Sequence, residues 1–263
     1  MASMLLQHAT WQEINSLPRD TIVVAPFGAM EQHGPHLPVE TDARIAAELT
    51  ARLDRAVDGS VLILPVQWAG YSPHHMDFAG SITLTAETYI RVAVEIIGSI
   101  ARAGFHRVLI LNSHGGNRAI LDVAATELKF QFPKATFVTA TYWNLARAEL
   151  QALRESPAGG MGHACELETS ILLAACPQNV KLQHADPDGA WPCSEFFAND
   201  MLAGSQAGIA SAFSEFTKSG TNGDPRTATA AKGEQFLSAI TARLALLVRQ
   251  YQSGDLLITK PVS

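Results

Sequence analysis

Short continuous apolar runs alternate along this chain with segments in which apolar residues recur at helical spacing. Three runs, Thr21–Pro26, Ser60–Val66 and Arg107–Leu111, are rich in aliphatic and β-branched residues. Such runs are typical of parallel strands that are covered on both faces. A fourth strand is predicted over Ala135–Ala140.

Helices are predicted between and after these strands. In Ala86–Ala103 the apolar residues recur at helical spacing, Thr85 is a suitable N-cap, and Gly104 stands where a glycine commonly ends a helix. Further helices are predicted over Asn117–Phe132, Glu166–Ala175 and Ala228–Tyr251.

Strands that alternate with helices predict an α/β fold with a mostly parallel sheet between helical layers. Ligands of such folds bind beyond the carboxyl ends of the strands, and the polar motifs of this chain follow predicted strands. The irregular segment Ala185–Gly223 is a candidate for a lid or a subunit contact. We find no internal repeat and no linker composition, so a single domain over residues 1–263 is expected.

The composition of the chain limits the kinds of partner that are expected. Hydrophobic residues make up 47% of the chain and the formal net charge is −6, with no basic cluster. This argues against nucleic acid or a membrane surface as the main partner, and no apolar stretch reaches the roughly 18 residues that cross a bilayer. The three cysteines are odd in number and lack C-x-x-C spacing, which favours a reducing compartment and a cytoplasmic protein.

The densest polar segment runs from Glu31 to Asp42. Glu31 and His33 are two residues apart, so their side chains point to the same side of an extended backbone. Asp42 follows a proline-rich turn and has two oxygens, so it could bridge two metal ions. A polar turn with a capping aspartate is the simpler alternative, but three potential ligands after a buried strand favour a Zn, Mn or Fe(II) site.

A second segment, Leu111–Asn117, leaves a predicted strand and enters a predicted helix. Its Gly115 and Gly116 allow close approach of the backbone to a ligand, and a helix N-terminus favours an anion. A tight turn alone would also explain the glycines. The position of His114 at a strand end, like those of Glu31 and Asp42, favours a metal ligand.

The third segment, Gly162–Ser170, combines His163, Cys165, Glu166 and Glu168. The two acids lie on different faces of a helix, so one could complete a metal site or carry a proton while the other caps the helix. An acid-rich helix N-terminus without any catalytic role is equally compatible with this pattern.

The fourth segment, Gly70–Met76, contains adjacent histidines, which face opposite ways on an extended chain, so at most one of them is expected to enter a site. Residues expected to contact a substrate are Ser72, His75, Gly115 and Gly116. Aromatic residues in Tyr71–His75, at Trp143 and in Trp191–Phe197 are further candidates for a substrate pocket.

Taken together, these segments resemble the creatininase (creatinine amidohydrolase) family over nearly the whole chain. The matching stretches are PFGAMEQHGPHLPVETDA, NSHGGN and GHACELETS, with weaker matches at YSPHHMDFAGSITL and SGTNGDPRTATAAKG. The combination of E-x-H, G-P-H-x-P and T-D is specific, whereas HGGN alone is not.

The resemblance implies a three-layer α/β/α sandwich, a dinuclear metal site and a homohexamer. By match to the motif, Glu31 and His114 would bind one metal, His33 the other, and Asp42 would bridge them. Glu166 would be a further ligand or proton shuttle, with Glu168 as the alternative. Two divalent ions per chain are expected, with zinc ahead of manganese and iron(II).

One departure bears on the substrate. Creatininase proper carries Tyr and Glu directly after the histidine of the second motif, where this chain has Gly115 and Gly116. A ligand of the second metal must therefore come from elsewhere. In this respect the chain resembles a broader branch that includes a formamide deformylase, a mycofactocin-maturing peptidase and an inosose-ring hydrolase, so creatinine is not the expected substrate.

The resulting prediction is a hydrolase that cleaves a C–N bond of an amide, cyclic amide or formamide in a small polar molecule, using a metal-activated water. His163 or Glu166 would pass a proton to the leaving nitrogen. Three alternatives remain: hydrolysis of another bond in a cyclic polar substrate, a Cys165 nucleophile with His163 as its base, and a non-catalytic binding module.

Overall fold

The computed structural model describes residues 4–190 and 193–256. In this part of the chain a five-stranded sheet has the order β1-β3-β2-β4-β5, and every neighbouring pair is parallel. The strands are β1 (Met4–Leu5), β2 (Ile22–Phe27), β3 (Val61–Ile63), β4 (Arg107–Asn112) and β5 (Thr136–Thr141). The predicted α/β fold with a parallel sheet is confirmed.

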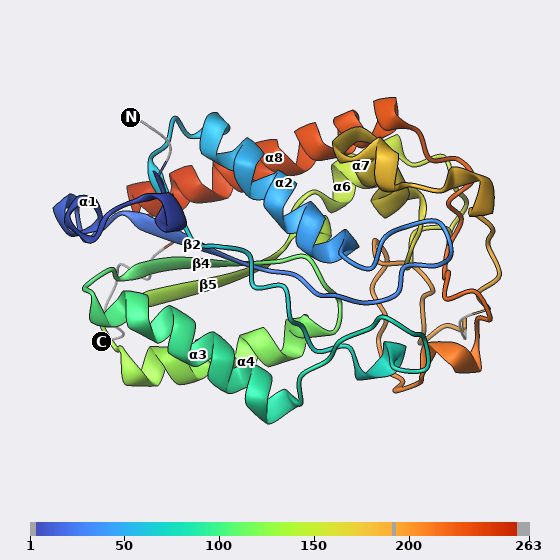
Figure 1. The fold of residues 1–263 in the computed structure, drawn as a ribbon, viewed down its shortest axis with the longest axis horizontal. Helices are drawn as coiled ribbons and strands as arrows, with labels where there is room; N and C mark the ends of the chain where they lie inside the picture. Colours follow the sequence, from blue (N-terminus) through green and yellow to red (C-terminus); the bar gives the residue numbers. More distant parts are fainter. Residues whose placement is uncertain (1–3, 191–192, 257–263) are drawn as a thin grey trace.

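Helices cover both faces of the sheet, which gives three layers (Figure 1). One layer holds α3 (Ala86–Arg102) and α4 (Asn117–Gln131), with the short α1 (Trp11–Ser16) at its edge. The other holds α2 (Thr41–Ala56), α7 (Glu166–Ala175) and α8 (Ala230–Ser253), together with the short α5 (Tyr142–Leu145) and α6 (Arg147–Leu153).

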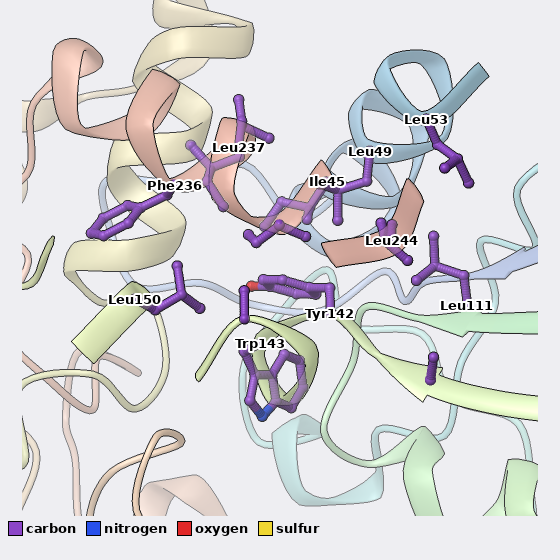
Figure 2. Close-up of a cluster of buried hydrophobic side chains, with 14 of the residues drawn as sticks. Ile45, Leu49, Leu53, Leu111, Tyr142, Trp143, Leu150, Phe236, Leu237 and Leu244 are labelled. Carbon is purple, nitrogen blue, oxygen red and sulfur yellow. The ribbon is translucent and has the colours of Figure 1, made fainter. Parts of the chain in front are cut away.

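The side chains of β2 alternate between two apolar cores. Ile22 and Val24 pack in the core under α2 and α8, whereas Val23 and Ala25 pack in the core under α3 and α4. Because both faces of the strand are covered, a continuous apolar run replaces the alternation of a half-exposed strand. Figure 2 shows the first core, where Tyr142 lies among leucines of α2 and α8.

The observed elements agree with most of the sequence predictions. Thr85 caps α3 by accepting a hydrogen bond from Thr88 N–H, and Gly104 beyond its end has φ +97°. The third strand is shorter than predicted and ends at Ile63, two residues before Pro65. Helix α2 was not predicted, and its start at Thr41 lacks a side-chain cap.

The loops that follow β2 and β4 lie at one end of the molecule, together with most of the segment between α7 and α8 (Figure 1). Parallel strands end at the same edge of a sheet, so the two chemistry-bearing segments meet there. In the described residues, no helix is both long enough and apolar enough to cross a membrane.

Candidate active site

Glu31 and His33 follow β2 in the chain and are each 1% exposed. His33 Nδ1 lies 3.2 Å from the backbone oxygen of Glu31, and because a carbonyl can only accept, this nitrogen carries the proton. His33 Nε2 is then the nitrogen available to a metal, and it faces Asp42 Oδ1 at 3.4 Å. The expected convergence of these three side chains is thus present in the structure.

Asp42 lies in the first turn of α2 and is 2% exposed. Its Oδ1 faces His33, and its Oδ2 lies 3.2 Å from His114 Nδ1. The carboxylate therefore stands between two histidines that come from different strand ends. This is the arrangement that a bridging ligand requires.

His114 directly follows β4, and its backbone is fixed by the side chain of Asn112. The Asn112 amide donates to the His114 carbonyl at 2.7 Å, and its oxygen accepts from His114 N–H at 3.1 Å. The ring Nε2 lies 3.0 Å from the Tyr71 carbonyl, so Nε2 carries a proton and Nδ1 is the nitrogen available to a metal. Nδ1 lies 3.2 Å from Glu31 Oε1.

The two acids of α7 have different environments. Glu168 is 4% exposed, and its Oε1 lies 3.8 Å from His33 Nε2. Its other oxygen accepts from Cys165 N–H at 3.4 Å, which closes the helix N-terminus. Glu168 therefore joins the group formed by His33 and Asp42.

Glu166, the acid preferred from the sequence, does not join this group. Its carboxylate accepts hydrogen bonds from Lys232 Nζ at 2.6 Å and from Ser156 N–H at 2.8 Å. Burial raises the pKa of Glu166, but the bonds from Lys232 and Ser156 outweigh burial and lower it. The two-residue offset of the two acids on α7 sends Glu166 toward α8, so Glu168, and not the expected Glu166, is the acid that approaches His33.

His163, from the same Gly162–Ser170 segment, is 8% exposed and lines a cavity. Its Nε2 donates to the Gln32 carbonyl at 2.7 Å, so the free nitrogen is Nδ1, which lies 3.8 Å from Glu31 Oε1. The next residue, Ala164, has φ +52°, a conformation uncommon for a residue other than glycine. With this turn between them, the side chain of His163 lines the cavity whereas that of Cys165 does not.

Gln32 organises two histidines and was not singled out from the sequence. Its amide nitrogen donates to His75 Nδ1 at 2.9 Å and to the Gly220 carbonyl at 3.0 Å. The proton of His75 then lies on Nε2, which points at Glu31 Oε1 at 3.2 Å. His75 is thus placed to orient the Glu31 carboxylate.

The charges of this cluster are strongly coupled. Burial raises the pKa of Glu31, but His114 and His75 outweigh burial and hold it well below its usual range. Burial lowers the pKa of His114, but Glu31 and Asp42 raise it to about 10. His163 behaves in the opposite way, because burial and the charges of His33 and His75 lower its pKa well below 6.5.

The donor set fits two divalent transition metal ions. Three buried atoms of the cluster, Glu31 Oε2, His33 Nε2 and Asp42 Oδ2, have no hydrogen-bond partner among the described residues. Two ligands about 2.1 Å from one tetrahedral ion are roughly 3.4 Å apart, which is close to the N···O separations around Asp42. Ligand atoms within 4.8 Å of one another form three groups: Glu31, His33 and His163; Glu31, His74 and His114; and His33, Asp42 and Glu168.

The hydrogen bonds behind the histidines strengthen this fit. Metal-binding histidines commonly donate their second N–H to a carbonyl or carboxylate, which fixes the tautomer. His33 does this to the Glu31 carbonyl and His114 to the Tyr71 carbonyl. Ser72, expected to contact substrate, is fully buried and its hydroxyl lies 3.2 Å from His114 Nε2, behind the histidine ring.

A cavity of about 400 Å³ opens over this cluster. Gly115, Gly116, His75 and His163 line it, as do Trp143 and Phe197, which the sequence suggested as pocket residues. Trp191 and Pro192, from the same suggestion, lie outside the described residues. The segment between α7 and α8 supplies much of the remaining lining, including Met201, Ile209 and Phe213.

The two glycines of the second motif differ in their surroundings. A Cβ at Gly115 would meet nothing within 4 Å, whereas a Cβ at Gly116 would lie 2.2 Å from the Tyr71 carbonyl and 2.6 Å from His114 Nε2. Gly116 is therefore required for the close approach of the Tyr71 loop to His114. A glutamate could not replace it without movement of that loop.

Cys165 is fully buried and does not line the cavity. Burial and the charge of Glu168 raise the pKa of its thiol well above the usual range. The thiolate is the nucleophilic form of cysteine, so this environment disfavours the Cys165 nucleophile.

An α/β fold with a buried cluster of carboxylates and histidines at the strand ends is typical of metal-dependent hydrolases. The model of the family described as creatininase, creatinine amidohydrolase, matches residues 7–248. The chain therefore belongs to the creatininase family of hydrolases.

Two relatives illustrate the range of this family. The chain is 32% identical over 240 residues to a mycofactocin precursor peptide peptidase of Mycobacterium ulcerans, which covers 88% of this chain and 86% of the relative. It is 24% identical over 266 residues to a creatinine amidohydrolase of Pseudomonas putida, with 94% and 97% covered. The chain is thus more similar to the peptidase than to this creatinine amidohydrolase.

Solved structures agree with this assignment. A Bacteroides fragilis protein provisionally called a creatinine amidohydrolase superposes with a TM-score of 0.81 at 25% identity, covering 97% of this chain and 99% of that one. A mutant creatininase described as of Zn-Zn type gives a TM-score of 0.78, and a manganese form of creatininase gives 0.77. Both are 25% identical and cover 95% of this chain and 98% of theirs.

Proposed function

We propose that this protein hydrolyses a C–N bond, that of an amide, cyclic amide or formamide, with two divalent metal ions held by Glu31, His33, Asp42, His114 and Glu168. The observation that carries the proposal is the Asp42 carboxylate, whose two oxygens face His33 and His114 separately. When bound, the ions supply Lewis acidity and lower the pKa of a water molecule to near neutrality.

The ligands divide into two sets around Asp42. Glu31 and His114 lie on the Oδ2 side, and His33 and Glu168 lie on the Oδ1 side. Glu168 thereby supplies the acidic ligand that creatininase proper carries at the position of Gly116. Because carboxylate and imidazole ligands suit zinc, manganese and iron(II), we expect one of these ions, with zinc first.

His163 is the proposed proton carrier. Its Nε2–H is engaged by the Gln32 carbonyl, so Nδ1 is the atom that can take up a proton and pass it to the leaving nitrogen. A neutral imidazole is needed before the transfer, and the low pKa of His163 maintains that state at neutral pH.

Other residues of the cluster hold the ligands in place. His75 points its Nε2–H at Glu31 and receives a hydrogen bond from Gln32, and this chain of contacts fixes the Glu31 carboxylate. His74 borders the cavity, and its ring lies parallel to that of His114 with centroids 5.7 Å apart. His74 is placed to contact a substrate above the cluster, as are Gly115 and Gly116.

The test is turnover by the metal-loaded protein of a panel of formamides, lactams and short peptides. We expect hydrolysis of at least one class, loss of activity after chelation, and recovery when zinc or manganese is restored. Turnover unaffected by complete metal removal would contradict the proposal. The similarity to a peptide peptidase makes peptides the first members of the panel.

A further inference from the structure

The cavity has two chemically different halves. At its base lie Glu31, Asp42, His114, His163 and Glu168. Five large apolar side chains also line the cavity, beside the polar Asn199, Ser205 and Asn222; they are called the apolar wall below and are Trp143, Phe197, Met201, Ile209 and Phe213. Phe213 joins the two halves, because its ring centroid lies 4.0 Å from that of His75 and 4.9 Å from that of His163.

The apolar wall holds no cation that could receive an anionic group. Among the described residues that line the cavity, none is a lysine or an arginine. A carboxylate or phosphate pressed against this wall would lose water without gaining a counter-ion, which is unfavourable.

Arg154, which contacts the cavity-lining Asp200, is already paired. The Arg154 guanidinium donates to Asp200 Oδ2 at 2.7 Å and to the Ser156 carbonyl at 2.9 Å, and its side chain is 7% exposed. The Asp200 carboxylate, which borders the cavity, also accepts from Gly159 N–H at 2.9 Å and from Leu202 N–H at 3.0 Å. Arg154 and Asp200 therefore neutralise each other and leave no net charge at the wall.

We propose that the substrate carries an uncharged, apolar group beyond the scissile bond, and that the apolar wall selects it. This inference rests on the proposed function, since the base of the cavity must hold the reacting bond. It narrows the expected small polar molecule to an amide with one polar end and one apolar end.

Two probes with the same metal-binding head test the selectivity. They are para-isopropylbenzohydroxamic acid and para-carboxybenzohydroxamic acid, titrated calorimetrically into the zinc-loaded protein. We expect the isopropyl probe to bind at least about tenfold more tightly than the carboxylate probe. Equal binding, tighter binding of the carboxylate probe, or no binding of either probe to fully loaded protein would overturn the proposal.

A single substitution provides the reverse experiment. Ile209 belongs to the wall and is 43% exposed, so a longer side chain there does not disturb the core. We expect Ile209→Lys to tighten binding of the carboxylate probe by about tenfold, whereas Ile209→Met leaves the preference unchanged. Unchanged selectivity in Ile209→Lys would contradict the proposal that the apolar wall selects the substrate.

Metal content separates this proposal from the one on which it rests. Binding of two zinc ions and turnover of amides without discrimination between the probes would support the proposed function and contradict selection by the apolar wall. A protein that takes up no metal overturns the proposed function and, with it, the inference about the wall.

Discussion

Nδ1 of His114 lies 3.2 Å from Oδ2 of Asp42, and the other oxygen of the same carboxylate faces His33. His114 follows β4, whereas Asp42 begins α2 after the long loop from β2. The parallel sheet brings these segments together, because both strands end at the same edge. The bridging position of Asp42 is therefore a consequence of the topology.

The acids of α7 provide a matched pair of substitutions. We expect Glu168→Gln to weaken metal binding by more than the roughly 10–100-fold that a change outside the ligand shell costs, because it removes a ligand oxygen near His33. Glu166→Gln should leave the metal content of the folded protein unchanged, because its carboxylate faces Lys232. Elemental analysis of both variants measures this, and the reverse order would contradict the assignment.

Metal uptake should release protons. Burial lowers the pKa of His114, but Glu31 and Asp42 raise it to about 10, so the metal-free protein holds a protonated His114 at pH 7. A metal needs the neutral ring, so the apparent affinity should rise with pH below about 10, by roughly tenfold per pH unit for each displaced proton. Calorimetry in buffers of different ionisation enthalpy measures the proton count, and uptake without proton release would contradict this prediction.

Glu166 should make stability depend on pH in a defined direction. Its folded-state pKa is lowered, so its contribution is complete above the unfolded-state value of about 4.3 and is lost as the pH falls through the folded value. Glu166→Gln leaves the buried Lys232 with Glu155 as its remaining carboxylate partner and should lower the free energy of unfolding at pH 7 by about 1–3 kcal/mol.

Urea unfolding in the presence of chelator at pH 7 and at pH 3 measures this effect. The difference between wild type and Glu166→Gln should be large at pH 7 and much smaller at pH 3. A difference that stays constant or grows on acidification would show that the Glu166–Lys232 pair is not its source.

Cys165 should be dispensable for the chemistry. Its thiol is buried, its pKa is raised, and it does not line the cavity. We expect Cys165→Ala to keep the rate per folded, metal-loaded chain within about twofold of wild type, because no step passes through the sulfur. Loss of turnover in a variant that still folds and binds metal would restore the nucleophile hypothesis.

Most of the fold could be predicted because its strands and long helices carry local signals. The apolar runs of β2 and β4 and the Thr85 cap of α3 are visible in the sequence and match the structure. Helix α2 has no side-chain cap to mark its start at Thr41, although Ile45, Leu49 and Leu53 recur at helical spacing. The N-terminal α1, in contrast, has a capping box between Thr10 and Glu13, whose spacing is visible in the sequence.

The site was only partly predictable, because its members are joined by long-range contacts. Glu31, His33, Asp42 and His114 share positions at strand ends, which the sequence reveals. The choice between Glu166 and Glu168 depends on Lys232, which lies 66 residues beyond Glu166 and pairs with it only in the folded chain. Gln32 gave no signal, because an amide between two ligand candidates has no distinctive spacing.

The most direct test of the central claim is the metal content per chain of wild type and Asp42→Ala, both purified without added metal. Asp54→Ala is the control, because Asp54 is also a buried aspartate of α2 but lies outside the cluster. We expect about two transition metal ions per chain in wild type and in Asp54→Ala, and a clear loss in Asp42→Ala. Wild-type protein that contains no metal and takes up neither zinc, manganese nor iron(II) would contradict it.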